Sequence, residues 1–170
     1  MRTAAVFCLG LALLATAHAA VADGSMAGSG DASLNGGNQV PTPVETTMTA
    51  MFTANVTGDA IAWKLEVFDA VNVTMAHIHL GNATTNGPPI VLLAPYGDAA
   101  ETSTLPEFEE PESGNLVYFG EFSAADVGPP LNGTTLPELL ATFMAGDAYV
   151  NVHTTAYPAG EIRGQIEWEM

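Results

Sequence analysis

Short stretches in which apolar and polar residues alternate run through the chain. The clearest is 60–68, where every second residue is apolar: Ile61, Trp63, Leu65 and Val67. A period of two predicts a β-strand with one buried and one solvated face. A second alternating stretch, 47–56, comes just before it, and Gly58-Asp59 lies between the two as a turn signal. The two stretches are therefore expected to form a β-hairpin.

Five further strands are expected, at 71–80, 90–93, 115–122, 147–153 and 161–168. A short first strand is expected near 32–34, and the acidic stretch 96–114, with its prolines, is expected to be a long loop. The one helix expected begins at Thr135 as N-cap, with Glu138 completing a capping box, and ends before Gly146. Its expected apolar face consists of Leu139, Leu140, Phe143 and Met144. This pattern predicts an all-β fold, an antiparallel Greek-key-like β-sandwich or barrel with one short helix.

The strand expected at 71–80 contains an anomaly in its alternation. Its first inward-facing residues are Val71, Val73 and Met75. Unbroken alternation would place His77 and His79 on the same inward face, where two imidazoles without partners would be costly. A β-bulge near Ala76, or a strand end there, would instead turn both histidines outward and Ile78 and Leu80 inward. We favour this second arrangement.

The first 22 residues have the features of a secretory signal peptide. A positive residue, Arg2, precedes an apolar run from Ala4 to Ala15, which is shorter than the ~20 residues that span a bilayer. Small residues predict cleavage after Ala19, with Ala22 as the alternative. The mature protein is expected to have no membrane span and to be secreted, or periplasmic if its source is bacterial.

Loss of the signal peptide removes the one cysteine, Cys8. Cysteine catalysis and thiolate metal sites are therefore excluded for the mature chain. Residues 23–31 are rich in glycine and serine, and we expect a flexible leader there. Residues 32–170 are expected to form a single domain, since a chain of this length can build one core.

The charge of the chain is strongly one-sided. The formal net charge is −16, and after cleavage only Lys64 and Arg163 face all 19 acidic residues. Such a surface repels nucleic acid, whose binding needs Lys and Arg to displace counterions. It attracts cations and basic partners, and it favours a soluble monomer.

Four Asn-x-Thr triplets are candidate N-glycosylation sites, and their asparagines are Asn55, Asn72, Asn82 and Asn132. Such a triplet is an acceptor only in a eukaryotic secretory route. If the sites are used, all four asparagines must lie on the surface.

The last two expected strands each have one apolar and one polar face. If residue 153 lies opposite residue 161, the polar faces give three cross-strand pairs: His153–Glu161, Asn151–Arg163 and Tyr149–Gln165. These residues form a candidate polar cluster, in which Glu161 is the expected ionic partner of Arg163.

His77 and His79 lie two residues apart on one strand, so their side chains share a face at ~6.6–7 Å spacing. Both rings could bind one metal ion, with His153 as a third ligand and Glu161 as a ligand or an outer partner. Copper and zinc are the candidate ions. A purely structural network of histidine, carboxylate and backbone groups is the alternative explanation for the same residues.

Three blocks of the sequence resemble the CHRD domain, the module repeated in the extracellular antagonist chordin. They are Leu34-Asn35-Gly36 with Gln39-Val40-Pro41, the block 76–81 with 87–91, and the block 148–154 with 157–166. The resemblance covers roughly Ala32 to Trp168. It implies an all-β extracellular domain and no established enzymatic activity.

A fainter similarity links the chain to copper–zinc superoxide dismutases. It rests on His77-x-His79 and on Ala159-Gly160-x-x-Arg163. The mature chain has too few histidines for the usual copper and zinc set, and no Gly-x-Ser-x-Gly or other nucleophile motif is present. We therefore expect a secreted, non-enzymatic binding or structural module whose partner is an extracellular protein, a glycan or a matrix component. The alternative is a protein that binds copper or zinc through these histidines. In that case its activity could resemble that of a superoxide dismutase.

Overall fold

The computed structural model describes residues 27–95, 107–109 and 114–170. The strands are β1 (Ser29–Asn35), β2 (Thr49–Thr57), β3 (Ala60–Phe68), β4 (Val73–Leu80), β5 (Pro89–Pro95), β6 (Glu107–Glu109), β7 (Leu116–Ser123), β8 (Ala148–Thr154), β9 (Ile162–Gln165) and β10 (Glu167–Glu169). The helical elements are α1 (Leu136–Met144) and the short 3-10 turns η1 (Gly36–Asn38) and η2 (Ala124–Asp126). The expected signal peptide lies outside the described residues.

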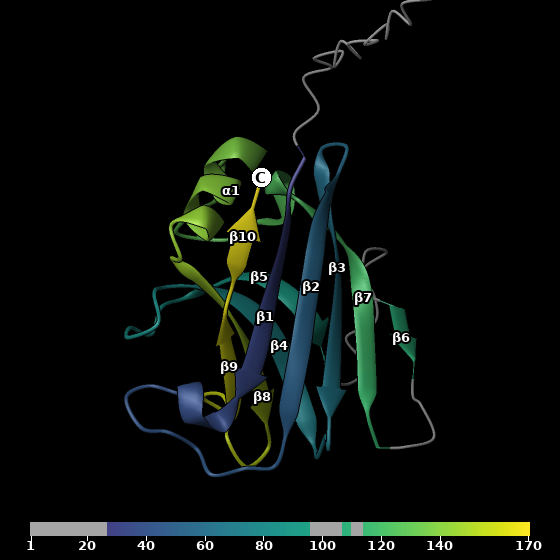
Figure 1. Ribbon diagram of the computed structural model, residues 1–170, viewed down its shortest axis with the longest axis vertical. Coiled ribbons are helices and arrows are strands. Elements are labelled where there is room, and N and C mark those ends of the chain that lie inside the picture. Colours follow the sequence, from purple (N-terminus) through teal and green to yellow (C-terminus); the bar gives the residue numbers. More distant parts are fainter. Residues whose placement is uncertain (1–26, 96–106, 110–113) are drawn as a thin grey trace, which may run out of the picture.

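All described strands belong to one antiparallel sheet with the order β5-β4-β8-β9-β1-β2-β3-β7-β6, and β10 pairs with β1. The sheet curls on itself, so that β4, β5 and β8 lie behind β1, β2 and β3 (Figure 1). β5 contacts β7, which brings the two ends of the sheet together. The result is a nearly closed barrel-like fold with α1 beside β10, and it confirms the predicted all-β class.

Two local predictions are confirmed closely. β2 and β3 form the expected hairpin, with Thr57 opposite Ala60 across the turn. The helix α1 has Thr135 as its N-cap, and the Glu138 carboxylate accepts hydrogen bonds from the Thr135 backbone N–H and hydroxyl, each at 2.8 Å. Met144 was expected on the buried face but is exposed, because the packed face ends at Phe143.

The C-terminal strand expected at 161–168 is divided into β9 and β10. β9 lies between β8 and β1 and pairs with both, whereas β10 pairs with β1, and the buried Ile166 lies between β9 and β10. Its backbone N–H donates to the Ala148 carbonyl, so the change of partner leaves this N–H bonded. The single expected strand therefore serves two neighbours in the sheet.

Three other boundaries differ from expectation. β1 begins at Ser29, within the stretch expected to be a flexible leader, and pairs along its whole length with β2. The stretch expected to be a long loop includes β6, which pairs with β7; the rest of that stretch, apart from Gly114, lies outside the described residues. β5 extends beyond 90–93 in both directions. Pairing with a neighbouring strand, which a sequence pattern does not display, produces each of these extensions.

The core fills the inside of the curled sheet, with alternate residues of β1, β2 and β3 buried there. The strand β8 is different, because every one of its residues is buried. Its apolar side chains face the core, and loops cover its polar face. The polar cluster expected on this face is thus enclosed rather than solvated.

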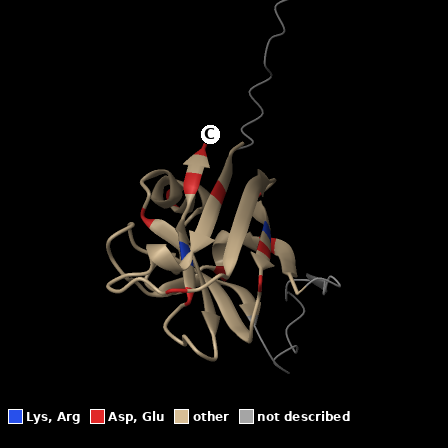
Figure 2. Cartoon of the chain, turned by 60° about the horizontal axis from the view of Figure 1, so that its bottom comes forward, with Lys and Arg blue, Asp and Glu red and all other residues tan. Residues whose placement is uncertain are grey.

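The four sequon asparagines are all exposed, as glycosylation would require. The acidic residues of the described part of the chain are spread over several elements (Figure 2). Among the described residues, no helix is both long and apolar enough to cross a membrane.

Candidate metal centre

The three histidines come from adjacent strands, two from β4 and one from β8. β4 and β8 pair antiparallel, with Met75 opposite His153, His77 opposite Asn151 and His79 opposite Tyr149. The register is irregular between Val73 and Met75 on this side, and again between Ala76 and His77 on the side of β5. The first of these irregularities reverses the alternation, so Ala76 and Ile78 are buried in the core and both histidines point away from it.

The reversal agrees with the bulge favoured from the sequence, with two corrections. Val71 and Met75 were both expected to face inward with Val73, but Val71 lies before β4 and is 65% exposed, and Met75 is 40% exposed. The change of parity therefore lies between Val73 and Ala76, and Met75 shares the outer face with the histidines. The outward turn does not leave them in open solvent, since His79 and His153 are buried and His77 is half-buried.

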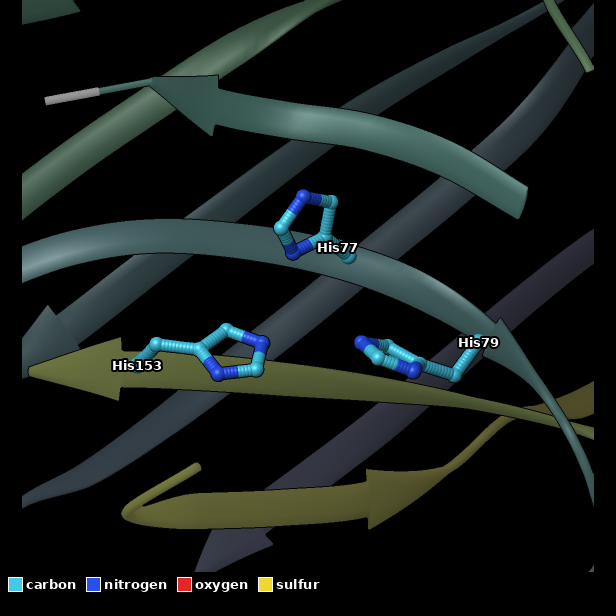
Figure 3. Close-up of side chains that lie close together, drawn as sticks. All are labelled: His77, His79 and His153. Carbon is cyan, nitrogen blue, oxygen red and sulfur yellow. The ribbon is translucent and has the colours of Figure 1, made fainter. Parts of the chain in front are cut away.

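The three rings converge on one point (Figure 3). The ring centroids of His77 and His79 are 5.5 Å apart, those of His77 and His153 are 5.2 Å apart, and those of His79 and His153 are 5.6 Å apart. One nitrogen from each ring lies within 4.8 Å of the other two. With bonds of ~2.0–2.1 Å and tetrahedral angles, two nitrogens bound to one zinc ion are ~3.4 Å apart. Binding would therefore require rotations of the rings that bring the nitrogens closer together by more than ~1 Å.

Backbone carbonyls fix the tautomers of two histidines. Nδ1 of His79 is 2.9 Å from the Gly87 carbonyl oxygen, and Nδ1 of His153 is 3.0 Å from the Pro158 carbonyl oxygen. A carbonyl oxygen only accepts, so in each ring Nδ1 carries the proton and donates it. The Nε2 atoms of both neutral rings therefore keep a free lone pair, which is the arrangement found at metal-binding histidines.

The nitrogens that face the convergence point have no protein partner. Of the five buried side-chain nitrogen and oxygen atoms without a hydrogen bond among the described residues, three are Nδ1 of His77, Nε2 of His79 and Nε2 of His153. Buried polar atoms are nearly always bonded, so each exception needs an explanation. Three exceptions directed at one point have a single explanation if one cation binds all of them.

The environment keeps the three rings neutral. Burial, together with the neighbouring His153 and His79, lowers the pKa of His77 to about 4. Burial also lowers the pKa values of His79 and His153, although the carbonyls of Gly87 and Pro158 partly oppose the effect. At neutral pH no proton has to leave before a metal binds.

A stack of three side chains supports the site from one side. The Tyr149 ring lies on His79, with centroids 5.0 Å apart and planes at 20°. The Arg163 guanidinium carbon lies 3.4 Å from the Tyr149 ring centroid, which is a cation–π contact. His79 is therefore held by a carbonyl at its edge and by Tyr149 on its face.

Arg163 is 1% exposed and does not have the expected carboxylate partner. Its guanidinium donates to the Asn86 side-chain oxygen at 3.0 Å, to the Asn82 carbonyl at 2.6 Å and to the Thr85 carbonyl at 3.0 Å. All three acceptors belong to the loop 81–88, which also carries the Gly87 carbonyl bound by His79. The arginine thus pins this loop to the sheet.

The carboxylate of Glu161, the expected ligand or outer partner, is engaged elsewhere. Its two oxygens accept hydrogen bonds from the hydroxyls of Thr46 and Thr154, both at 2.6 Å. Glu161 lies before the start of β9, and the Pro158 carbonyl takes the place expected for it beside His153. The expected pairing of His153 with Glu161 is therefore replaced by a bond to the connecting loop.

The rest of the polar cluster has the predicted register. Asn151 pairs with Arg163, and Tyr149 pairs with Gln165. The Asn151 side chain bonds to Gln39 at 2.7 Å and to the Ala159 carbonyl at 3.3 Å. Gln165 donates to carbonyls of the loops and of β8. These residues hold the covering loops in place rather than contacting the convergence point.

Sequence reasoning missed the two carbonyls that orient the histidines, since a backbone oxygen has no side-chain signal. One indirect signal exists at Gly87. A Cβ added there would lie 1.6 Å from the Leu80 carbonyl oxygen, so only glycine brings this carbonyl to His79.

Together these features describe a curled β-sheet whose enclosed polar face carries a candidate three-histidine metal centre. The family model of the CHRD domain matches residues 31–166, so the chain belongs to the CHRD domain family. No curated protein and no solved structure matches the chain significantly. Family and fold support a non-enzymatic binding or structural module, and CHRD domains occur in extracellular proteins.

Proposed function

We propose that this protein is an exported CHRD-domain module that binds one copper or zinc ion through His77, His79 and His153. The observation that carries the proposal is the convergence of three unpartnered buried nitrogens, all in neutral rings, within 4.8 Å of one another. Imidazole nitrogen suits both zinc and copper. Three protein ligands leave a further coordination position for another ligand.

The contacts that orient the histidine rings favour metal binding rather than a purely structural role. Carbonyls of Gly87 and Pro158 orient two rings, and Tyr149 supports one of them. Groups that orient a ligand histidine in this way typically change metal affinity by about 10–100-fold when they are removed. A network built only for stability would be expected to pair these nitrogens with protein donors.

A dismutase-like reaction has less support. The arginine that carries the resemblance, Arg163, is 1% exposed, and the Tyr149 ring lies between it and His79. An anion arriving from solvent could not reach its guanidinium, which is already bonded to the loop 81–88. We therefore assign Arg163 a positioning role and propose no catalytic step.

The competing occupant is a trapped water molecule. A water donates only two hydrogen bonds, so it satisfies the three nitrogens only if Nδ1 of His77 is protonated and donates to it. In that case the three histidines would serve a structural network, and added metal would have little effect. The two hypotheses thus differ in a measurable way.

Calorimetric titration of the mature protein with Zn²⁺ and Cu²⁺ tests the proposal. We expect one site per chain, and we expect its loss in the double variant His77→Ala/His79→Ala. The variants Asn55→Gln and Asn132→Gln, at exposed positions far from the histidines in the sequence, serve as controls and should bind as the wild type does.

Absence of histidine-dependent binding tighter than about micromolar, equivalent to about −8 kcal/mol, would contradict the proposal. Binding of several ions that survives the double variant would point to the acidic surface instead. A stability loss in the double variant without any metal effect would favour the structural network.

A further inference from the structure

Met75 lies on the rim of the histidine site. It is directly opposite His153 in the pairing of β4 with β8, and it precedes His77 by two residues on the same outer face. Directly opposed residues have Cβ atoms ~4.5–5.5 Å apart. A methionine has three rotatable side-chain bonds, so its sulfur can reach toward the point where the rings converge.

The exposure of Met75 is not explained by packing. Its side chain is 40% exposed, although methionine is an apolar residue that usually fills gaps in a core. Met51 on β2 is also exposed, at 48%, so exposure alone is no evidence for a role. What separates Met75 from Met51 is its place beside three histidines with unpartnered nitrogens.

The donor set carries no negative charge. Among the described residues, the group of potential ligands contains three histidines and neither a carboxylate nor a cysteine. A thioether is a ligand that selects Cu(I), whereas Zn²⁺ gains little from it. Imidazole nitrogens and one thioether together match a cuprous ion better than a hard cation.

The buried arginine favours an ion of low charge. The Arg163 guanidinium contacts the Tyr149 ring, and the Tyr149 ring stacks on His79. The guanidinium donates its hydrogen bonds to neutral oxygens of the loop 81–88. A buried positive charge repels a dication about twice as strongly as a monocation at the same distance. The contribution of Arg163 to the field therefore penalises Cu²⁺ and Zn²⁺ more than Cu⁺.

We infer that Met75 is a fourth ligand and that the preferred ion of the site is Cu(I), held by Met75 with His77, His79 and His153. This inference rests on the proposed function, since it assigns the metal and a ligand of that same site.

The test is an anaerobic competition titration of Cu(I) against a chromophoric cuprous chelator, with Met75→Leu as the variant. Leucine keeps nearly the same volume and removes only the sulfur. Met51→Leu is the matched control, because it makes the same change at an exposed position on another strand. Zn²⁺ affinity is measured in parallel on all three proteins.

We expect Met75→Leu to weaken Cu(I) binding by about tenfold or more, equivalent to ~1.4 kcal/mol. Zn²⁺ binding should change by less than about twofold, equivalent to ~0.4 kcal/mol, and Met51→Leu should change neither. X-ray absorption at the copper edge should show a sulfur neighbour in the wild type that is absent in Met75→Leu.

Equal Cu(I) affinity in wild type and Met75→Leu, with no sulfur neighbour, would overturn the inference and leave the three-histidine site intact. A loss of both Cu(I) and Zn²⁺ affinity in Met75→Leu would also overturn it, because the effect would then not be specific to sulfur. Absence of histidine-dependent binding of any ion would instead overturn the proposed function itself.

Discussion

At the scale of single residues, the site depends on the protonation state of its imidazoles. The carbonyls of Gly87 and Pro158 accept hydrogen bonds from the Nδ1–H groups of His79 and His153, so Nε2 of each of these rings keeps its lone pair. Burial lowers the pKa values of all three histidines, which keeps these nitrogens unprotonated near neutral pH. The chemistry of the site therefore follows from which atoms surround each ring.

The lowered pKa of His77 has a consequence for the stability of the metal-free protein. In the unfolded chain this ring takes up a proton near its ordinary value of 6.5, whereas in the folded protein it does so only near 4. Between these values the unfolded state binds more protons, so acidification favours unfolding. The contribution is fully present above about pH 6.5 and is lost progressively as the pH falls toward 4.

Urea denaturation at a series of pH values measures this effect. We expect the free energy of unfolding of the wild type to decrease from pH 6.5 to pH 4, and His77→Gln to show a smaller decrease over that window. A wild-type stability that is constant or rises on acidification would contradict the neutral, buried rings. An identical slope in His77→Gln would show that other groups, such as His79 and His153, carry the effect.

At the scale of elements, the loop 81–88 positions the site together with the strands that carry the histidines. It provides the Gly87 carbonyl to His79, and three acceptors in it receive the hydrogen bonds of Arg163. The arginine comes from β9 and the histidine from β4, so the loop connects two strands that do not pair with each other. Removing the arginine should disturb both the fold and the site.

The variant Arg163→Lys tests this connection. Lysine keeps the charge but cannot reproduce the planar fork of donors or its contact with the Tyr149 ring. Hydrogen bonds to charged groups contribute ~1.5–3 kcal/mol each, so we expect thermal or urea unfolding to show a loss of at least about 2 kcal/mol, together with weaker metal binding. The control is Lys64→Arg, at an exposed pair with Glu66 whose contribution should be ~0–1 kcal/mol.

If Arg163→Lys is as stable as the wild type, the loop is held by its other contacts, such as the hydrogen bond from the Asn86 side chain to the Val40 carbonyl. A stability loss with unchanged metal affinity would mean that the loop does not position His79. Either result would separate the structural role of Arg163 from the positioning role.

At the scale of the whole molecule, the alternating patterns predicted most of the strands and the one helix. The hairpin of β2 and β3 and the capped helix α1 are local, so neighbouring residues specify them. The division into β9 and β10 and the enclosure of the β8 polar face were not predictable, because both depend on which distant segments lie beside them. The three histidines were singled out by their spacing, but their tautomers depend on loop carbonyls that leave no sequence pattern.

Acidic residues elsewhere in the molecule compete with the histidine site for metal ions. The formal net charge is −16, and the acidic residues in the described part of the chain lie on several elements (Figure 2). Such a surface attracts any cation weakly and is screened by salt, with a Debye length of ~8 Å at physiological ionic strength. The histidine site differs in being built of converging, unpartnered nitrogens rather than of dispersed charge.

The most direct measurement is an anomalous difference map from crystals of the mature protein grown with Zn²⁺ at physiological salt. We expect one dominant peak bounded by Nδ1 of His77, Nε2 of His79 and Nε2 of His153, at about 2.0–2.1 Å from each nitrogen. Peaks confined to surface carboxylates, or no peak between the three rings, would contradict the account.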